Sequence, residues 1–422
     1  MTLLWSDETE ARIRSEAYSI DEQIRPRTVK YCRSCVVSNQ RPRIQFDSTG
    51  LCSACLYAEY KNNGIPWDIR HDKLVSLLSK HRRKSGYDVV VPCSGGKDSS
   101  YVAHILKHKY GMHPLCVKFA PFMYTEVGKS NWEKFRQSGF DCMEFFPDGL
   151  THRKLARLCF EYLGDPFQPF VYGQLALPMK VAKYFGIGLV MYGENGEAEY
   201  GGDPGANDRP RWDAAHWDRI YTKGSGIEKI WNIGKSLSVL EGEPSEAYTL
   251  PSDVSSSAEF HWLGYYLKWH PQSNYYYAAK HTGFEANPDG RSEGTYSRYA
   301  SLDDKLDGLH YYMAYIKFGI GRCTSDAAHE IRDGEITRDE GIRLVRRYDG
   351  ELSVKHLDEC LNYLGMDKEH LKTVVDRFRP DHIWEDLGED GWRLKHGVWR
   401  AEETPHGKAG YQIPQSGENH PA

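Results

Sequence analysis

The chain of 422 residues has no long apolar run, and no stretch approaches the roughly 18 apolar residues that a membrane-spanning helix needs. It also lacks the apolar core of a secretory signal, because its start, MTLLWSDETEARIRSEAYS, turns acidic at once. There is no internal repeat and no excess of positive charge, since the net charge is −5. We therefore expect a cytoplasmic globular protein, without a membrane partner and without a nucleic-acid partner.

One stretch, Tyr87–Tyr110, organises the chain and reads YDVVVPCSGGKDSSYVAHILKHKY. Its β-branched start predicts a buried parallel strand, and its end has apolar residues at helical spacing. Two glycines between them allow a sharp turn, and a helix start adds unpaired N–H donors. The pattern predicts a phosphate-binding loop. Its residues are Ser94, Gly95, Gly96, Lys97, Asp98, Ser99 and Ser100.

This loop lacks the Gly-x-x-x-x-Gly-Lys-Ser/Thr pattern of a Walker A motif. SGGKDS after a strand instead resembles the PP-loop of ATP pyrophosphatases. That resemblance implies ATP as cofactor, cleaved between its α and β phosphates, with AMP transferred to an oxygen of the substrate. The alternative is a Gly-Ser turn before an ordinary helix.

Strands and helices alternate around and after this loop. Further strands are expected at 113–119, 140–146 and 187–192, and helices at 68–84, 128–138, 150–163 and 174–185. Such alternation predicts an α/β fold with a doubly wound parallel sheet, which binds ligands beyond the carboxyl ends of its strands.

An acidic loop, Gly193–Asp203, follows the fourth expected strand at that edge. Carboxylate oxygens suit Mg²⁺ bridging the phosphates of ATP, so we expect Asp98 and Glu194 to hold magnesium and Glu197 to assist. Polar side chains beside them would contact the substrate: Asn195, Glu199 and Tyr200. The alternative is a glycine-rich surface loop.

Two cations lie near the end of a helix expected at 302–318. Lys317 and Arg322 are placed to fold back onto the leaving pyrophosphate. The alternative is a solvated helix end.

Two Cys-x-x-Cys pairs precede the nucleotide-binding segment. Cys32, Cys35, Cys52 and Cys55 have the spacing of a four-thiolate structural zinc site. Disulfides are disfavoured in a cytoplasmic chain, whereas an iron–sulfur cluster could use the same four ligands. We expect a small zinc ribbon, whose metal ion supplies the folding energy that so small a core lacks.

The chain divides into five segments in this reading. They are a leader (1–30), the ribbon (31–67), the nucleotide-binding domain (68–322, with an aromatic-rich insertion at about 204–300), a helical module (323–400) and a disordered tail (401–422). In the helical module, Thr337 and Ser353 are expected N-caps. The insertion is either substrate-facing or an oligomer interface.

Taken together, the paired Cys-x-x-Cys pattern, PCSGGKDSSY, GENGEAEYGG and YIKFGIGRCTSDAAHEIRDGEITRDEG resemble one family, the N-acetyl sugar amidotransferases. These are PP-loop enzymes of surface-polysaccharide and nonulosonic-acid pathways, and the resemblance covers about residues 31–380. It implies that an N-acetylated nucleotide sugar or free sugar is adenylated on its carbonyl oxygen, and that ammonia then replaces AMP to give an acetamidino sugar.

The nitrogen donor is expected to be a separate protein. Position 2 is Thr rather than a nucleophilic Cys, and no Gly-x-Cys-x-Gly motif occurs, so the chain lacks a glutaminase of its own. The resemblance implies a partner class I glutaminase subunit that supplies ammonia. Two alternatives stay open: a PP-loop enzyme of tRNA thiolation, which needs cysteines near the site, and a non-catalytic nucleotide-binding regulator.

Overall fold

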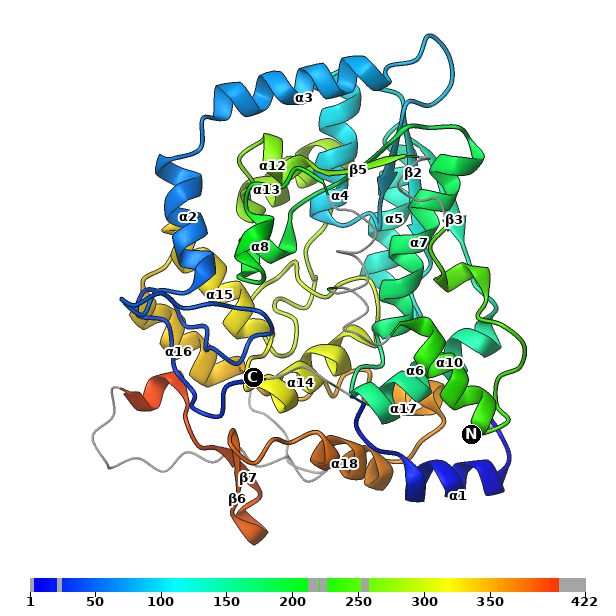
Figure 1. Cartoon of the computed structure of the whole chain (residues 1–422), viewed down its shortest axis with the longest axis vertical. Coiled ribbons are helices and arrows are strands. Elements are labelled where there is room, and N and C mark those ends of the chain that lie inside the picture. Colours follow the sequence, from blue (N-terminus) through cyan, green and yellow to red (C-terminus); the bar gives the residue numbers. More distant parts are fainter. Residues whose placement is uncertain (1–3, 21–24, 212–219, 221–225, 252–257, 402–422) are drawn as a thin grey trace.

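The computed structural model describes residues 4–20, 25–211, 220, 226–251 and 258–401. The fold is built on a five-stranded parallel sheet of order β3-β2-β1-β4-β5, which lies in the upper right of Figure 1. Its strands are β1 (Val89–Pro92), β2 (Pro114–Phe119), β3 (Asp141–Phe145), β4 (Leu189–Tyr192) and β5 (Glu259–Trp262). The predicted doubly wound α/β fold is confirmed, and so are the four predicted strands.

The two faces of the sheet follow the alternation of side chains along its strands. Val89 and Val91 point into one core, with α3 (Trp67–His81), α4 (Lys97–His104) and α5 (Glu126–Gln137). Val90 points into the other core, which includes α7 (Gln168–Tyr184). Because successive residues of a strand face opposite sides, an uninterrupted valine run fits a sheet covered on both faces.

The fifth strand lies in the aromatic-rich insertion, where no strand was predicted. β5 pairs in parallel with β4 along four residues. It leads through α12 (Leu263–Tyr266) to α13 (Pro271–Thr282), which packs on α4. The insertion therefore completes the sheet and covers the helix of the phosphate-binding loop. Parts of the insertion (212–219, 221–225 and 252–257) lie outside the described residues.

The four predicted helices at 68–84, 128–138, 150–163 and 174–185 correspond to α3, α5, α6 (Gly149–Leu163) and α7. Other helices before and around the sheet are α1 (Asp7–Glu16), α2 (Ser53–Asn63), η1 (Ile105–Lys109), α8 (Gly196–Tyr200), η2 (Pro204–Ala206), α10 (Ile227–Ser236) and η3 (Glu246–Tyr248). The predicted helix after the phosphate-binding loop is divided, since α4 continues into the π-helical turn η1.

The C-terminal part is largely helical, as predicted. It contains α14 (Asp307–Phe318), α15 (Arg322–Asp333), α16 (Arg338–Tyr348), α17 (Leu357–Leu364) and α18 (Lys368–Arg377), then η4 (Gly388–Asp390) and η5 (Val398–Ala401). It also holds an antiparallel hairpin of β6 (Trp384–Asp386) and β7 (Trp392–Leu394), which was not expected. Disorder was expected for the tail, residues 401–422. Residues 402–422 lie outside the described part of the chain.

The two expected N-caps had different outcomes. Thr337 caps α16 in a reciprocal capping box with Glu340. The expectation for Ser353 was wrong: α17 begins after His356, and the Ser353 hydroxyl donates a hydrogen bond to Glu293.

Candidate active site

The strand order reverses between β1 and β4, and a cavity of about 410 Å³ lies beyond the carboxyl ends of these strands. In a doubly wound sheet such a reversal opens a crevice between neighbouring loops. The loop after β1 contributes five of the predicted residues to the cavity wall: Ser94, Gly96, Lys97, Asp98 and Ser99. The loop after β4 contributes Glu194, and the start of α15 contributes Arg322.

Hydrogen bonds within the loop after β1 fix its shape. The Ser94 hydroxyl accepts from the Gly96 N–H at 3.2 Å, and the Ser99 hydroxyl donates to the Gly96 carbonyl at 3.2 Å. Gly95 has a φ of 85°, and a Cβ there would lie 2.9 Å from the Trp132 Cα atom. Only glycine fits this position, because the loop packs against the backbone of α5 there. The unpaired N–H groups at the start of α4 are left to face an anion. This geometry fits the phosphates of ATP.

Ser100 does not reach the cavity, although the loop motif includes it. Its side chain is fully buried, and its hydroxyl has no hydrogen-bond partner among the described residues. It faces the core beneath the loop, one helical position beyond Ser99.

Lys97 and Asp98 form an ion pair at the cavity wall. The Lys97 Nζ also lies 5.3 Å from the centre of the Tyr299 ring. The Asn274 amide, on α13, donates to Asp98 at 3.1 Å. Asn274 comes from the aromatic insertion, and its role in orienting Asp98 was not visible in the local sequence.

Glu194 is the acidic residue of the β4 loop that faces the cavity. Burial raises the pKa of its carboxyl, and the negative charge of Asp98 raises it further, to about 7. Two neighbouring carboxyls that repel one another are stabilised as anions by a shared cation. The oxygens of Asp98 and Glu194 thus form a donor set that fits Mg²⁺.

The other predicted residues of the β4 loop do not line this cavity, although the charges of Glu194, Arg322 and Asp98 act on the Tyr200 phenol. Both Glu197 oxygens accept hydrogen bonds from the Arg43 guanidinium, at 2.6 and 2.9 Å. Glu199 is buried and pairs with Lys61 at 2.9 Å. The Asn195 side chain caps α8 and donates to the Ala206 carbonyl, and the Tyr200 ring lies under Arg41. The contacts with Arg41, Arg43 and Lys61 connect α8 to the four-cysteine segment.

The two predicted cations also differ in position. Arg322 lines the cavity, stacks over the Tyr311 ring at 4.6 Å and pairs with Asp326. Lys317 is buried on α14, where its ammonium donates to the Leu163 carbonyl at 2.7 Å. Lys317 thus lies outside the residues that line the cavity, because the last turn of α14 faces α6.

Several cavity residues were not found from the sequence. Aspartates from the segment before α14 form one wall, aromatic residues form another, and Lys118 at the end of β2 lies between. They include Lys118, Phe119, Phe167, Phe170, Gln174, Tyr299, Asp303, Asp304 and Asp307. Burial raises the pKa of Asp304 to about 7, although its carboxylate accepts backbone N–H bonds from Phe122 and Leu306. One available signal was a single lysine inside the otherwise apolar strand HPLCVKF.

Three cysteines that look isolated in the sequence are neighbours in the sheet. Cys116 pairs in register with Cys142, and Cys93 lies within hydrogen-bonding reach of Cys116. Burial raises the pKa of Cys93, but hydrogen bonds from Cys116 and Ser99 outweigh that effect and leave it below the ordinary value. Cys93 lines the cavity, so a thiol is present beside the phosphate-binding loop.

The two Cys-x-x-Cys pairs meet in one cluster. The four Sγ atoms of Cys32, Cys35, Cys52 and Cys55 all lie within 4.8 Å of one another, and two of these contacts are 3.7 Å. Four thiolates at about 2.3 Å from one tetrahedral ion are about 3.8 Å apart. A [4Fe–4S] cluster holds each thiolate on a different iron atom and spreads the sulfurs more widely. The spacing therefore fits a single zinc ion.

The four-cysteine segment is held against both the C-terminal helices and α8. Its cysteines share a core with Ala327 of α15 and Ile342 of α16. In Figure 1 these two helices lie beside the four-cysteine segment, which is drawn in blue. The Arg338 guanidinium donates to the carbonyls of Cys32 and Cys35. With Arg43–Glu197 and Lys61–Glu199, these contacts connect the metal-binding segment to the loop that carries Glu194.

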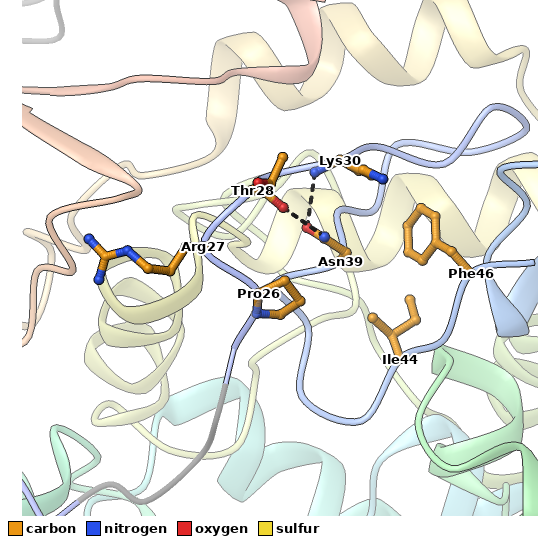
Figure 2. Close-up of a pocket in the computed structure, with 7 residues that line it drawn as sticks. All are labelled: Pro26, Arg27, Thr28, Lys30, Asn39, Ile44 and Phe46. Atoms are coloured by element: carbon orange, nitrogen blue, oxygen red, sulfur yellow. Dashed lines mark hydrogen bonds between the residues drawn. The ribbon is translucent and has the colours of Figure 1, made fainter.

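A second cavity, of about 400 Å³, lies on the outer side of this segment. Figure 2 shows that Asn39 crosses it, accepting from the Lys30 N–H at 3.0 Å and donating to the Thr28 carbonyl at 2.9 Å. Arg27 points away toward solvent and pairs with Asp381. None of the residues predicted to be functional lines this cavity.

Within the described residues, every helix is too short or too polar to cross a membrane. No curated protein matches the chain. One similar solved structure is the U34-tRNA thiolase NcsA from Methanococcus maripaludis with its [4Fe-4S] cluster. It is 13% identical, the alignment covers 81% of this chain and 100% of that one, and the TM-score is 0.27, too low to support a conclusion on fold or function.

The C-terminal part matches a known family. Residues 293–397 match the model described as "LPS biosynthesis protein WbpG-like, C-terminal domain". The match begins before α14 and runs through the hairpin β6–β7, so it includes Asp303, Asp307 and Arg322 of the cavity wall. Over these residues, about a quarter of the chain, the protein is similar to the WbpG-like LPS biosynthesis family, which confirms the predicted resemblance to surface-polysaccharide biosynthesis in that part.

Proposed function

We propose that the protein is an ATP-dependent amidotransferase of lipopolysaccharide or related surface-polysaccharide biosynthesis, which converts the N-acetyl group of a sugar to an acetamidino group. The observation that carries the proposal is the cavity itself. It joins a phosphate-binding loop to carboxylates from the β4 loop and from the segment that matches the WbpG-like domain.

The reaction begins with an amide, whose carbon is a poor electrophile and whose oxygen is a poor leaving group. The amide oxygen attacks the α-phosphorus of ATP, and the bond from this phosphorus to the bridging oxygen of pyrophosphate breaks. Backbone N–H groups at the start of α4, together with Lys97, stabilise the charge that develops on the departing pyrophosphate. Mg²⁺, which Asp98 and Glu194 would hold, supplies neutralisation of charge on the phosphates.

The second half of the reaction exchanges oxygen for nitrogen. Ammonia attacks the carbon of the O-adenylated intermediate, a proton leaves the new nitrogen, and the carbon–oxygen bond breaks to release AMP. No side chain has to form a covalent bond, because positioning and charge stabilisation suffice. Ammonia is reactive only when unprotonated, which favours delivery from a docked glutaminase over capture from solution.

The test measures pyrophosphate release from Mg²⁺-ATP and ammonium with a panel of UDP- and CMP-linked N-acetyl sugars. We expect sugar-dependent AMP and pyrophosphate, and a product whose mass reflects the exchange of one oxygen for one NH group. Release of pyrophosphate without any change in the mass of a sugar would argue against the proposal.

One observation supports a second candidate function, PP-loop tRNA thiolation: the thiol of Cys93 lines the cavity. Thiolation requires catalytic or cluster-binding cysteines near the site, whereas amidotransfer does not. The variant Cys93→Ser separates the two. We expect it to retain at least half of the pyrophosphate-forming activity with the sugar, while complete loss, together with AMP formation on tRNA by the wild-type protein, would favour thiolation.

A further inference from the structure

Lys118 is a buried cation at the edge of the cavity. It lies at the carboxyl end of β2, directly beside the start of the phosphate-binding loop, because Val117 pairs with Pro92 and the Cys93 N–H donates to the Val117 carbonyl at 2.9 Å. Its side chain is 2% exposed and lines the cavity.

The ammonium of Lys118 has no hydrogen-bond partner among the described residues. Its Nζ lies 4.4 Å from the centre of the Tyr124 ring and 4.6 Å from that of Trp132. The Glu144 carboxylate is 4.0 Å away and already accepts hydrogen bonds from the hydroxyl of Tyr124 and the indole of Trp132. Three N–H donors are thus held in place without an acceptor.

The other cations that line the cavity are engaged. Lys97 pairs with Asp98, and Arg322 pairs with Asp326. Burial lowers the pKa of Lys118, and the charges of Asp303 and Glu144 only partly oppose that effect. An ammonium in such a place gains most from an anion that enters the cavity.

We propose that Lys118 binds the α-phosphoryl group of the nucleotide, the part that stays on the substrate after pyrophosphate has left. The inference rests on the proposed function, because it assumes a nucleotide in this cavity. The loop after β1 offers its donors to the two phosphates that depart, so the third phosphate lies next to that loop. Asp303 is within hydrogen-bonding reach of Ser94 and faces Lys118, which places the ammonium at the start of this loop.

This position gives Lys118 a distinct role in both halves of the reaction. It stabilises negative charge on the phosphorus that is attacked, and it then holds the adenylate oxygen while ammonia displaces AMP. Lys97, in contrast, acts on pyrophosphate, which leaves in the first half.

The experiment measures equilibrium binding of AMP, inorganic pyrophosphate and UDP, each with Mg²⁺, by titration calorimetry. The proteins are wild type, Lys118→Met, Lys118→Arg and Lys97→Met. Lys118→Met should weaken AMP binding about 10- to 100-fold, as expected for loss of a charge-assisted hydrogen bond, and change pyrophosphate affinity less than twofold. Lys97→Met should show the opposite pattern, and Lys118→Arg should recover part of the AMP affinity.

Three outcomes would overturn the inference. Unchanged AMP affinity in Lys118→Met would refute the role of Lys118, although the assignment of the nucleotide site would stand. Weakened UDP binding with unchanged AMP binding would assign Lys118 to the phosphates of the sugar nucleotide instead. If the wild-type protein bound neither AMP nor pyrophosphate, the nucleotide site and the proposed function would fail together.

Thermal unfolding separates this role from a structural one. The Lys118 ammonium makes no hydrogen bond among the described residues, and Glu144, 4.0 Å away, keeps its bonds from Tyr124 and Trp132, so Lys118→Met should melt close to the wild-type temperature. A marked loss of stability would identify Lys118 as a structural lysine held by its aromatic neighbours and would argue against the inference.

Discussion

Two loops meet at the carboxyl edge of the sheet, and they use their polar residues in opposite ways. The loop after β1 turns its polar groups into the cavity and is held by hydrogen bonds among its own members. The loop after β4 sends one carboxylate, Glu194, into the cavity and ties Glu197 and Glu199 to residues more than 130 positions away. One loop carries its geometry in its own sequence, whereas the other depends on the metal-binding segment for its shape.

Loss of the metal ion tests this dependence most severely. Cys52→Ser should release zinc and lower the melting temperature, because structural zinc supplies about 10 kcal/mol or more of folding free energy in small zinc domains. Metal content by elemental analysis and thermal unfolding are the measurements. Cys142→Ser, a cysteine outside the four-cysteine cluster, is the matched control and should keep its metal. Unchanged metal content in Cys52→Ser would refute the zinc site.

A buried lysine tests the contact between the β4 loop and the metal-binding segment. Lys61→Met leaves Glu199 and Asp333 buried with only the His329 imidazole beside them, so the free energy of unfolding should fall by about 3–5 kcal/mol. Denaturant unfolding measures the change. A loss below about 1 kcal/mol would show that the β4 loop keeps its shape without this contact.

The corresponding lysine of the β1 loop should affect activity rather than stability. Lys97→Met removes a cation that faces the cavity, and kcat/KM for pyrophosphate release should fall about 100- to 1,000-fold, as for loss of one group that stabilises transition-state charge. The melting temperature should stay close to that of the wild type. Retained activity would contradict the assignment of this loop to the phosphates.

The smallest expected effect is a pH dependence carried by Glu194. Its pKa is raised from 4.5 to about 7, so the folded protein binds more protons than the unfolded chain between these values. In the metal-free protein, the protonated Glu194 carboxyl therefore favours the folded state. This contribution to the free energy of unfolding is fully present below pH 4.5 and is lost as the pH rises through about 7. Conversely, Mg²⁺ needs the carboxylate, so its apparent affinity should rise between about pH 6 and pH 8.

The variant Glu194→Gln should bind Mg²⁺ weakly and without this rise, whereas Glu197→Gln, in the same loop but outside the cavity, should keep it. Calorimetric titration of Mg²⁺ in the presence of ATP measures both. A rise that persists in Glu194→Gln would assign the titration to another carboxyl, of which Asp304 is the nearest candidate by its pKa of about 7.

The same contrast explains what the sequence predicts well. Four strands and the phosphate-binding loop were found because their signals are local: β-branched runs and a glycine turn before a helix. β5 was missed because its four residues, EFHW, lie in a segment rich in aromatic residues and prolines, and only pairing with β4 makes them a strand. Glu197 and Glu199 were assigned to the cavity because their partners, Arg43 and Lys61, belong to another part of the chain.

Lys118 shows the remaining limit. Its strand was predicted, but whether a lysine inside a strand faces solvent or a cavity depends on which element covers it. Here α5 supplies Trp132, which covers both Gly95 and Lys118. No local pattern encodes this contact.

The position of Arg338 has a consequence for the newly synthesised chain. This arginine caps the carbonyls of Cys32 and Cys35 but follows Cys35 by 303 residues. At 5–20 residues per second, the ribosome needs roughly 15–60 s to produce it. During that interval the first cysteines emerge without their C-terminal cover, while all four, from Cys32 to Cys55, are already available. The four thiols are therefore free to take up a zinc ion before α16 exists to cover them.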